Sequence, residues 1–408
     1  MRGMIRRKKI IAAFSMFFLL AIPCFSAEFN DPLFPAAQSP VISTRSAVLL
    51  DAETGTILFS QNPNMVIAPA SLTKLMTIHL ALRAIRTGKA SENDIVALPP
   101  ESWAENQPPR SSLMFLGRNQ IVTLGELLLG MAVSSGNDAA VATALHLAPS
   151  IDAFIAMMNA EAGRLGLPST RFTEPAGIAP ENITTAMDYA RFCKVYIGEH
   201  PESLTLLHST TVFAYPKAIN TVLEQPRTIV QNNRNTLLNR VSGVDGLKTG
   251  YIPEAGFNMA LSAQRGEIRL IAILLGASSE EERDRDGEAL LNWGFENFKT
   301  LRPVADFLPT VRIWSSKEKY AALKLTEDLR FTVSSRRAGV LLIDTELTPY
   351  LKAPLPEGAQ CGAFIISDEI GELRRIPLVL EKEAVRGNFF QVFFDAIRMF
   401  FQKHFGKK

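Results

Sequence analysis

The sequence predicts a mixed α/β (α+β) protein: an antiparallel sheet flanked by helices, then a small all-β domain and an amphipathic terminal helix. Three observations support this prediction. Hairpin-like strand pairs occur near residue 50 and again near residue 265, with helical periodicity between them. After about residue 301, short Val, Ile, Leu and Phe runs separated by turn residues replace the helical patterns. The tail from residue 387 onward is rich in phenylalanine.

The chain is long enough for two or three domains at 408 residues, and it is too apolar, at 47% hydrophobic, to be disordered. We expect a leader, a main domain, a β-rich domain and a terminal helix, with the boundaries 1–27, 28–300, 301–386 and 387–408. Lys and Arg number 43 and Asp and Glu 41, so the net charge is only +2. Nothing in this balance indicates a nucleic-acid partner.

The cysteines and histidines exclude several classes of protein. Three cysteines, Cys24, Cys193 and Cys361, are too few for a disulfide scaffold or a Cys-rich zinc module. The five histidines are scattered, so we expect no metal and no cofactor. Cys193 and Cys361 are expected to be buried thiols, and a disulfide bridge between them is the alternative.

Residues 1–27 have the layout of a secretory signal peptide. A basic head precedes an apolar run over residues 10–22, and small residues follow at Ser26 and Ala27. The run is shorter than the ~20 residues that a membrane-spanning helix needs. We therefore expect an exported protein whose leader is removed together with Cys24; an uncleaved anchor is the alternative.

Strand and helix patterns alternate along the first 300 residues. Strands are expected at 46–50 and 56–60, around the turn Asp51–Gly55. Helical patterns follow at about 70–87, 123–133, 138–147 and 151–165. Thr123 and Glu126 form a capping box at the start of the second of these helices. Further strands are expected at 246–251, 257–263 and 268–275, and a helix at about 281–299.

The C-terminal part combines short strands with an aromatic helix. Strands are expected at 339–343, 363–366 and 376–380. In the tail, one helical face is polar, and the phenylalanines cover most of the rest; the polar face consists of Gln391, Asp395, Arg398 and Gln402. A wide aromatic face with a basic end is typical of a helix in a membrane interface. A helix docked on the β-rich domain or on a partner is the alternative.

A serine and a lysine at helical spacing are the first candidates for chemistry. Ser71-Leu72-Thr73-Lys74 puts the hydroxyl and the amine on one helical face, within hydrogen-bond reach. A serine hydroxyl needs a base, and a lysine whose pKa is lowered by burial or by a nearby cation serves as one. The pattern alone is weak, because Ser316 to Lys319 matches it too. We interpret that second match as a solvated charged turn.

Two further motifs follow in the chain. Ser135-Gly136-Asn137 lies between two expected helices, where helix capping is the alternative interpretation. Lys248-Thr249-Gly250 occurs once, at the end of an expected strand; there the cation and the hydroxyl could bind a carboxylate. Gly250 would let another backbone or a ligand approach that strand, and an exposed turn is the alternative.

The three motifs, in this order and in these contexts, form the signature of penicillin-binding proteins and class A β-lactamases. The chain therefore resembles the penicillin-interacting serine acyltransferases. More closely, it resembles the low-molecular-weight D-alanyl-D-alanine carboxypeptidases of the penicillin-binding protein 5/6 group, over nearly its full length. One departure is Gly136, where the signature set has Asp, although the 5/6 group commonly has Gly there.

The resemblance implies a β-lactamase/transpeptidase-like fold and a serine-type carboxypeptidase that removes the terminal D-alanine from peptidoglycan stem pentapeptides. It implies that Ser71 is the acylated nucleophile, that Lys74 is its base and that Ser135 relays a proton to the leaving D-alanine. The oxyanion hole would consist of the backbone N–H groups of Ser71 and Tyr251. Substrate contacts are implied for Asn137, Lys248, Thr249, Tyr251, Arg234 and Arg283. For the two arginines, structural ion pairs are an equal alternative.

The implied partners are peptidoglycan stem peptides, β-lactams that acylate and inhibit the enzyme, and a membrane surface contacted by the terminal helix. The implied location is the periplasmic face of the bacterial inner membrane. A DD-endopeptidase, a β-lactamase and a non-enzymatic wall-binding module are the alternatives. A β-lactamase of this type deacylates with a Glu-activated water. No E-x-x-x-N lies between Ser135 and Lys248, where Glu174 and Glu181 lack that spacing.

Overall fold

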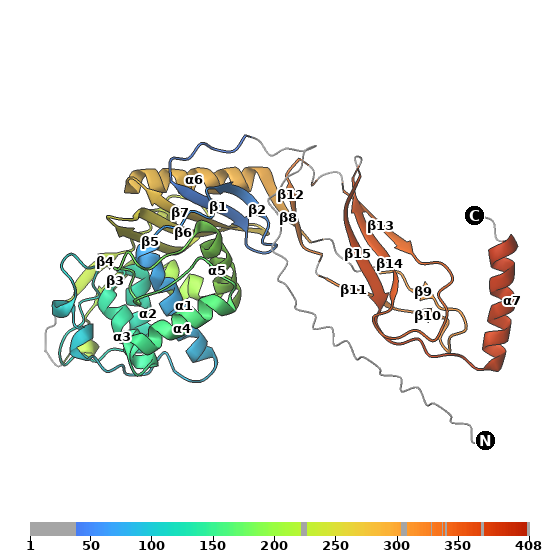
Figure 1. The fold of residues 1–408 in the computed structure, drawn as a ribbon, viewed down its shortest axis with the longest axis horizontal. Coiled ribbons are helices and arrows are strands. Elements are labelled where there is room, and N and C mark those ends of the chain that lie inside the picture. The colour runs from blue at the N-terminus through green and yellow to red at the C-terminus, as the bar shows by residue number, and fades with distance from the viewer. Residues whose placement is uncertain are drawn as a thin grey trace, which may run out of the picture.

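The computed structural model describes residues 38–221, 227–302, 308–327, 329–336, 338, 341–368 and 371–405. The expected leader, residues 1–27, lies outside the described residues. Figure 1 shows a larger body of helices around a sheet, a smaller body of strands, and a helix at the C-terminal end.

A five-stranded antiparallel sheet in the order β2-β1-β7-β6-β5 forms the centre of the larger body (Figure 1). Its strands are β1 (Ser46–Asp51), β2 (Ile57–Gln61), β5 (Val244–Ile252), β6 (Gly256–Arg265) and β7 (Ile268–Ala277). β1 pairs along its whole length with β7, so the two ends of the helical insertion meet in one sheet. The expected antiparallel sheet is confirmed, and β5, which carries the Lys-Thr-Gly motif, is an edge strand.

Helices cover both faces of this sheet. α6 (Glu280–Asn297) lies on one face. The helices α1 (Lys74–Arg86) and α5 (Ala186–Glu199) belong to the layer on the other face. On β7, Ile271, Ile273 and Leu275 join the core around α1, and the alternate residues join the core beneath α6. Because side chains alternate along a strand, this pattern requires both faces to be buried.

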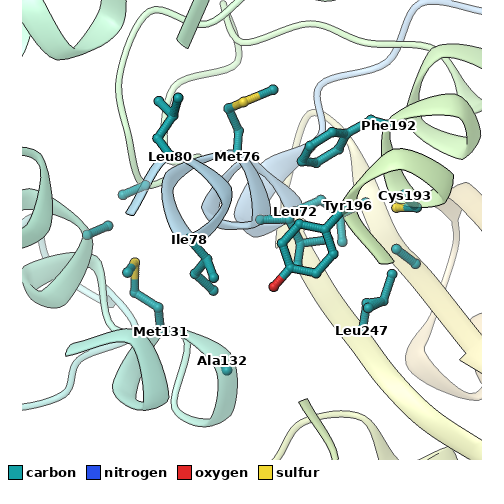
Figure 2. Packing of buried hydrophobic residues seen from close by; sticks show 14 of the residues in the cluster. Leu72, Met76, Ile78, Leu80, Met131, Ala132, Phe192, Cys193, Tyr196 and Leu247 are labelled. Carbon is teal, nitrogen blue, oxygen red and sulfur yellow. The ribbon is translucent and has the colours of Figure 1, made fainter. Parts of the chain in front are cut away.

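α1 is the central helix of the larger core. Figure 2 shows Met76 and Ile78 of this helix between Met131 on one side and Phe192 and Tyr196 on the other. All residues from Lys74 to Leu82 are buried. The remaining helices of this layer are α2 (Leu124–Val133), α3 (Asn137–Leu147) and α4 (Ile151–Arg164). The Thr123–Glu126 capping box is present, as the sequence predicts.

Shorter elements connect these helices and strands. The hairpin of β3 (Val212–Tyr215) and β4 (Ile229–Asn232) lies outside the main sheet. The short helices are η1 (Ala70–Thr73), η2 (Pro100–Ser102), η3 (Ala104–Asn106), η4 (Leu204–His208), η5 (Ala218–Asn220) and η6 (Thr236–Asn239). The helix expected at 281–299 ends at Asn297, because Phe298 begins a strand that pairs with the C-terminal region.

The C-terminal region is rich in strands, as expected. β8 (Phe298–Leu301) pairs with β12 (Phe331–Ser334), and a four-stranded sheet has the order β11-β15-β14-β13. The other strands are β9 (Val311–Arg312), β10 (Tyr320–Ala321), β11 (Leu323–Leu325), β13 (Leu342–Leu347), β14 (Gln360–Ser367) and β15 (Glu372–Leu380). They enclose a separate apolar cluster. The interpretation of residues 316–319 as a solvated turn is wrong for Ser316, which is buried and donates to the Val385 carbonyl oxygen at 3.1 Å.

The last helix, α7 (Phe389–Phe405), docks on the β-rich region through its polar face. The carboxylate of Asp395 accepts hydrogen bonds from Ser315 N at 2.8 Å and from Arg312 at 3.1 Å. The aromatic face is exposed; Phe389, Phe390, Phe393, Phe394, Phe400 and Phe401 are 50–76% accessible. In the part of the chain that the structure describes, no single helix has the length and apolarity to cross a membrane, although the bent pair α3 and α4 passes on those criteria together.

The thiols of Cys193 and Cys361 are both free and buried, so the expectation of buried thiols is confirmed. Burial raises the pKa of both thiols. An apolar surrounding disfavours the thiolate, which is the reactive form. These cysteines therefore belong to the packing of the two cores.

Candidate active site

The turn from η1 into α1 brings the Ser71 hydroxyl and the Lys74 amine together. The two residues are one helical turn apart, and Lys74 Nζ lies 3.0 Å from Ser71 Oγ. Ser71 is half-buried, whereas Lys74 is completely buried within the apolar core around α1. The hydroxyl is therefore accessible to a substrate while the amine is shielded from water.

Three oxygen atoms surround the Lys74 amine. Besides Ser71 Oγ, it contacts Asn137 Oδ1 at 2.7 Å and the Ala176 carbonyl oxygen at 2.5 Å. The last two oxygens only accept hydrogen bonds. A neutral amine has two hydrogens and one lone pair. With both hydrogens donated to Asn137 and Ala176, the lone pair is left for the Ser71 hydroxyl. The neutral amine is thus oriented as a base toward Ser71.

Burial sets the protonation of this amine. Desolvation lowers the pKa of Lys74 from 10.5 to about 7; Glu174 and Asp138 raise it in part, and Arg234 lowers it further. At pH 7.5 an amine with a pKa near 10.5 would be unprotonated in about one molecule in 1,000. With a pKa near 7, a large share of the molecules hold the free base.

The Ser-Gly-Asn motif forms the break between α2 and α3. Ser135 has a left-handed backbone with φ of 62°, and its buried hydroxyl has no hydrogen-bond partner among the described residues. Such unpaired, strained groups occur at functional sites. Gly136 fits because a Cβ there would lie 2.9 Å from Met114 N and 2.7 Å from the carboxylate of Asp138. The glycine at this departure from the signature set therefore has a steric cause.

The edge strand β5 packs against the start of the nucleophile helix. A Cβ added to Gly250 would lie 2.9 Å from Ser71 N and from the Pro69 carbonyl oxygen. Lys248 and Thr249 are buried just before this contact, and the Lys248 amine donates to the Thr249 carbonyl oxygen at 3.0 Å. Burial, with Lys74, Arg234 and Arg283 nearby, lowers the pKa of Lys248. The positive potential of Arg234 and Arg283 around Lys248 would attract a carboxylate.

The remaining candidates differ in their placement. Arg234 is exposed, and its positive charge lowers the pKa of both Lys74 and Lys248. Arg283 is buried in an ion pair with Asp284 at 2.8 Å, and Asp284 also accepts from Thr236, so Arg283 acts on Lys248 only as a neighbouring charge. Tyr251 is 51% exposed, and its ring lies on Phe257.

Two acidic residues that the sequence analysis did not assign to the site bind backbone N–H groups next to it. Asp138 accepts hydrogen bonds from the backbone N–H groups of Met114, Phe115 and Leu116 at 2.8–3.0 Å, and its burial raises the pKa of its carboxyl group. Glu174 binds the backbone of its own loop, whose Ala176 carbonyl contacts Lys74. These partners are backbone groups, so no residue pattern could have revealed the contacts.

One histidine group among the described residues has ligand atoms close enough for a metal ion. It consists of His79, Glu199 and His200, whose atoms lie within 4.8 Å of one another between α1 and α5. Hydrogen bonds within the protein already use these atoms: His79 Nε2 contacts Glu161 at 2.8 Å, and its Nδ1 contacts His200 at 3.0 Å. Arginines also bind the carboxylates of Glu161 and Glu199, so these candidate ligand atoms already have partners within the protein.

An antiparallel sheet with helices on both faces, and a Ser–Lys pair at a helix start beside an edge strand, define the class of penicillin-interacting serine acyltransferases. Within that class, the chain belongs to the D-alanyl-D-alanine carboxypeptidase family, which it matches over residues 34–279. The predicted family, fold class and enzyme class, a serine peptidase hydrolase, are thereby confirmed.

Individual relatives match beyond the main domain. D-alanyl-D-alanine carboxypeptidase DacC of Escherichia coli is 34% identical over 405 residues, which cover 97% of this chain and 96% of that protein. The crystal structure of penicillin-binding protein 5 from Haemophilus influenzae matches with a TM-score of 0.76 and 31% identity, over 86% of this chain and 100% of that one. Penicillin-binding protein 6B from E. coli matches with a TM-score of 0.71 and 32% identity, over 86% and 99%.

Proposed function

We propose that this chain removes the terminal D-alanine from peptidoglycan stem pentapeptides through an acyl-enzyme on Ser71. The observation that carries the proposal is the 3.0 Å contact between Ser71 Oγ and the Lys74 amine, which has two further oxygen acceptors in Asn137 and Ala176. A hydroxyl beside an unprotonated, oriented amine is an activated nucleophile.

In the acylation step, Lys74 Nζ takes the hydroxyl proton as Ser71 Oγ bonds to the carbonyl carbon of the penultimate D-alanine. The negative charge passes to the carbonyl oxygen, which we assign to the backbone N–H groups of Ser71 and Tyr251. The contact between Gly250 and Ser71 N supports this assignment, because it brings the two backbones together. Losing one such donor typically costs ~10²–10³ in rate.

In the next step, the peptide C–N bond breaks and its electron pair becomes the amine lone pair of the leaving D-alanine. That nitrogen takes a proton, which we route from Lys74 through the Ser135 hydroxyl. The unpaired, buried state of the hydroxyl supports this role, because a relay must be free to donate and accept. Water then hydrolyses the ester and releases the shortened stem peptide.

Substrate recognition is assigned to the groups around this pair. Lys248 and Thr249 would bind the terminal carboxylate, with Arg234 adding positive potential from an exposed position. Asn137 would hold the substrate amide through the side of its carboxamide that Lys74 does not occupy. Arg283 is assigned a structural and electrostatic role, because its guanidinium is paired with Asp284.

Penicillin would acylate Ser71 rapidly, and the acyl-enzyme would hydrolyse slowly. Glu174 does not offer a free carboxylate to a deacylating water, because both of its oxygens accept backbone hydrogen bonds at 2.5–2.9 Å. Glu181 is exposed on the same loop. This arrangement favours a penicillin target over the alternative of a β-lactamase.

We further propose that residues 28–300 form the catalytic domain, that residues 301–386 form a β-rich domain, and that residues 387–408 anchor the protein. The exposed phenylalanines of α7 favour peripheral binding to a membrane surface. Together with the predicted leader, the exposed aromatic face supports a location at the periplasmic face of the bacterial inner membrane.

The test is to incubate the mature chain with labelled penicillin, and separately with diacetyl-Lys-D-Ala-D-Ala and with cross-linked wall dimers. A stable label on Ser71, with D-alanine release faster than dimer cleavage, is the expected result; Ser71→Ala should abolish both. Preferred dimer cleavage would make the protein an endopeptidase. Rapid penicillin turnover would make it a β-lactamase, and no label at all would leave a binding module.

A further inference from the structure

The segment from Thr173 to Asn182, here called the clamp loop, packs against the helix that carries the Ser–Lys pair. The Ala176 carbonyl accepts from Lys74 Nζ at 2.5 Å, and the Pro175 carbonyl accepts from Thr77 Oγ1 at 2.8 Å. Gly177 lies so close to η1 that an added Cβ would be 1.9 Å from the Ala70 carbonyl oxygen. The clamp loop therefore fixes the position of the Ala70 backbone, just before Ser71, and of the Lys74 amine.

The carboxylate of Glu174 holds this loop in shape. Its Oε2 accepts from Ala176 N at 2.7 Å, and its Oε1 accepts from Gly177 N at 2.5 Å and from Ile178 N at 2.9 Å. Successive backbone N–H groups that converge in this way form an anion-binding nest. The anion in the nest is a side chain of the loop itself, so the loop conformation depends on that one carboxylate.

Asn182 connects the nest to the helix. It is fully buried, and its amide nitrogen donates to Glu174 Oε1 at 2.8 Å and to Thr73 Oγ1 at 3.1 Å. Its amide oxygen accepts from Thr173 N at 2.6 Å. A continuous set of hydrogen bonds thus runs from the Glu174 carboxylate to the residue next to Lys74.

We propose that Glu174 is a positioning residue for acylation, whose carboxylate holds the Ala176 carbonyl oxygen against the Lys74 amine and so directs the amine's lone pair at Ser71. The inference rests on the proposed function, because it assigns Lys74 as the base. Without the Ala176 carbonyl as an acceptor, the neutral amine could rotate and point one of its hydrogens, instead of its lone pair, at Ser71 Oγ. Glu174 itself would touch neither substrate nor leaving group.

The charge of Glu174 gives the proposal a specific signature. Lys74 faces four groups that carry or can carry charge: Glu174 on the clamp loop, Asp138 on α3, Arg234 before η6 and Lys248 on β5. Glu174 and Asp138 raise the pKa of Lys74, and Arg234 lowers it. Removing the Glu174 charge should therefore lower the pKa of Lys74. An uncharged residue that only shaped the loop would not produce that shift.

The experiment uses Glu174→Gln, which removes the charge and keeps an acceptor, and Glu174→Asp, which keeps the charge and shortens its reach. Glu181→Gln is the matched control, because Glu181 is exposed on the same loop. Three quantities are measured: penicillin acylation rate against pH, D-alanine release, and the Lys74 titration by NMR of ¹³C-labelled lysine. Thermal unfolding reports whether each variant is folded.

We expect Glu174→Gln to move the acidic limb of acylation and the Lys74 titration to lower pH. We expect Glu174→Asp to keep the wild-type titration but to acylate ~10-fold or more slowly on the plateau, because misplacement by about 1 Å costs up to ~10²-fold. Glu181→Gln should match the wild type. If both Glu174 variants acylate at the wild-type rate with an unshifted limb, the proposal is wrong. If Glu174→Gln does not fold, the plateau rate of a folded Glu174→Asp decides.

Failure of the proposed function gives a different result. If the wild type takes the penicillin label but releases no D-alanine, the carboxypeptidase assignment fails while the acylation and titration data still test Glu174. If the wild type takes no label, the NMR titration decides, since it needs no turnover. An unshifted Lys74 titration in Glu174→Gln would then overturn the inference.

Discussion

The backbone of Gly250 meets the backbone of Ser71 with no side chain between them, since a Cβ on Gly250 would lie 2.9 Å from Ser71 N. The edge strand and the nucleophile helix thus form one wall of the site. Both candidate oxyanion donors lie next to this contact, on Ser71 itself and on Tyr251 directly after the glycine. Their spacing therefore depends on a residue that takes no chemical part in the reaction.

Gly250→Ala should slow acylation strongly. The added methyl group would push β5 away from η1 and displace the oxyanion donors, so we expect a loss of about 10²-fold in the rate of penicillin labelling. Gly163→Ala is the matched control, because Gly163 lies in α4 with nothing within 4 Å of an added Cβ. Wild-type labelling by Gly250→Ala would show that the contact does not set the site.

Acylation should require the neutral form of Lys74. Burial lowers the pKa of this amine to about 7, so the base is lost as the pH falls through that value. The labelling rate should be low at pH 5, rise through about pH 7 and be flat above it. Stopped-flow labelling between pH 5 and pH 9 measures this curve. A rate that still rose tenfold per pH unit up to pH 9 would mean that the pKa of Lys74 is not lowered.

The neighbouring residues Ser134 and Ser135 should separate stability from chemistry. Ser135→Ala removes a hydroxyl without a partner among the described residues, so we expect unchanged thermal unfolding but a turnover loss of ~10²-fold or more. Ser134→Ala removes a buried hydrogen bond of 2.7 Å to the Gly130 carbonyl oxygen. That variant should lose ~1 kcal/mol of stability and keep most of its turnover. The reverse pattern would argue against a proton relay through Ser135.

Sequence motifs predicted those parts of the candidate site that depend on side-chain chemistry. Ser71, Lys74 and Lys248 are recognisable by type and spacing, and the structure brings them together. The clamp loop was not identified, because Glu174 binds backbone N–H groups, which every residue but proline offers. Its role depends on how residues distant in sequence pack against α1, and local pattern does not encode that packing.

For the fold, too, the elements with a strong local sequence signal were predicted and others were missed. Strands and helices with a strong apolar period were predicted to within a few residues, and the capping box at Thr123 was correct. α5 was missed, although Thr185 caps it by accepting from Asp188 N at 3.1 Å. A Thr-x-x-Asp pattern before an apolar stretch is a helix-start signal that could have revealed it. The β3–β4 hairpin has no comparable signal, since it is short and lies outside the main sheet.

The aromatic face of α7 should bind membranes while its polar face stays on the β-rich region. Replacing Phe393 and Phe400 by Ser removes two exposed rings, each worth ~1.5–3 kcal/mol when buried in an apolar phase, so binding to anionic vesicles should weaken at least ~10-fold. Gln402→Ala, on the polar face, is the control. Truncation before Gly387 should move the protein into the soluble fraction in sedimentation. If the truncated chain still sediments with vesicles, α7 is not the anchor, and its docking through Asp395 is its main role.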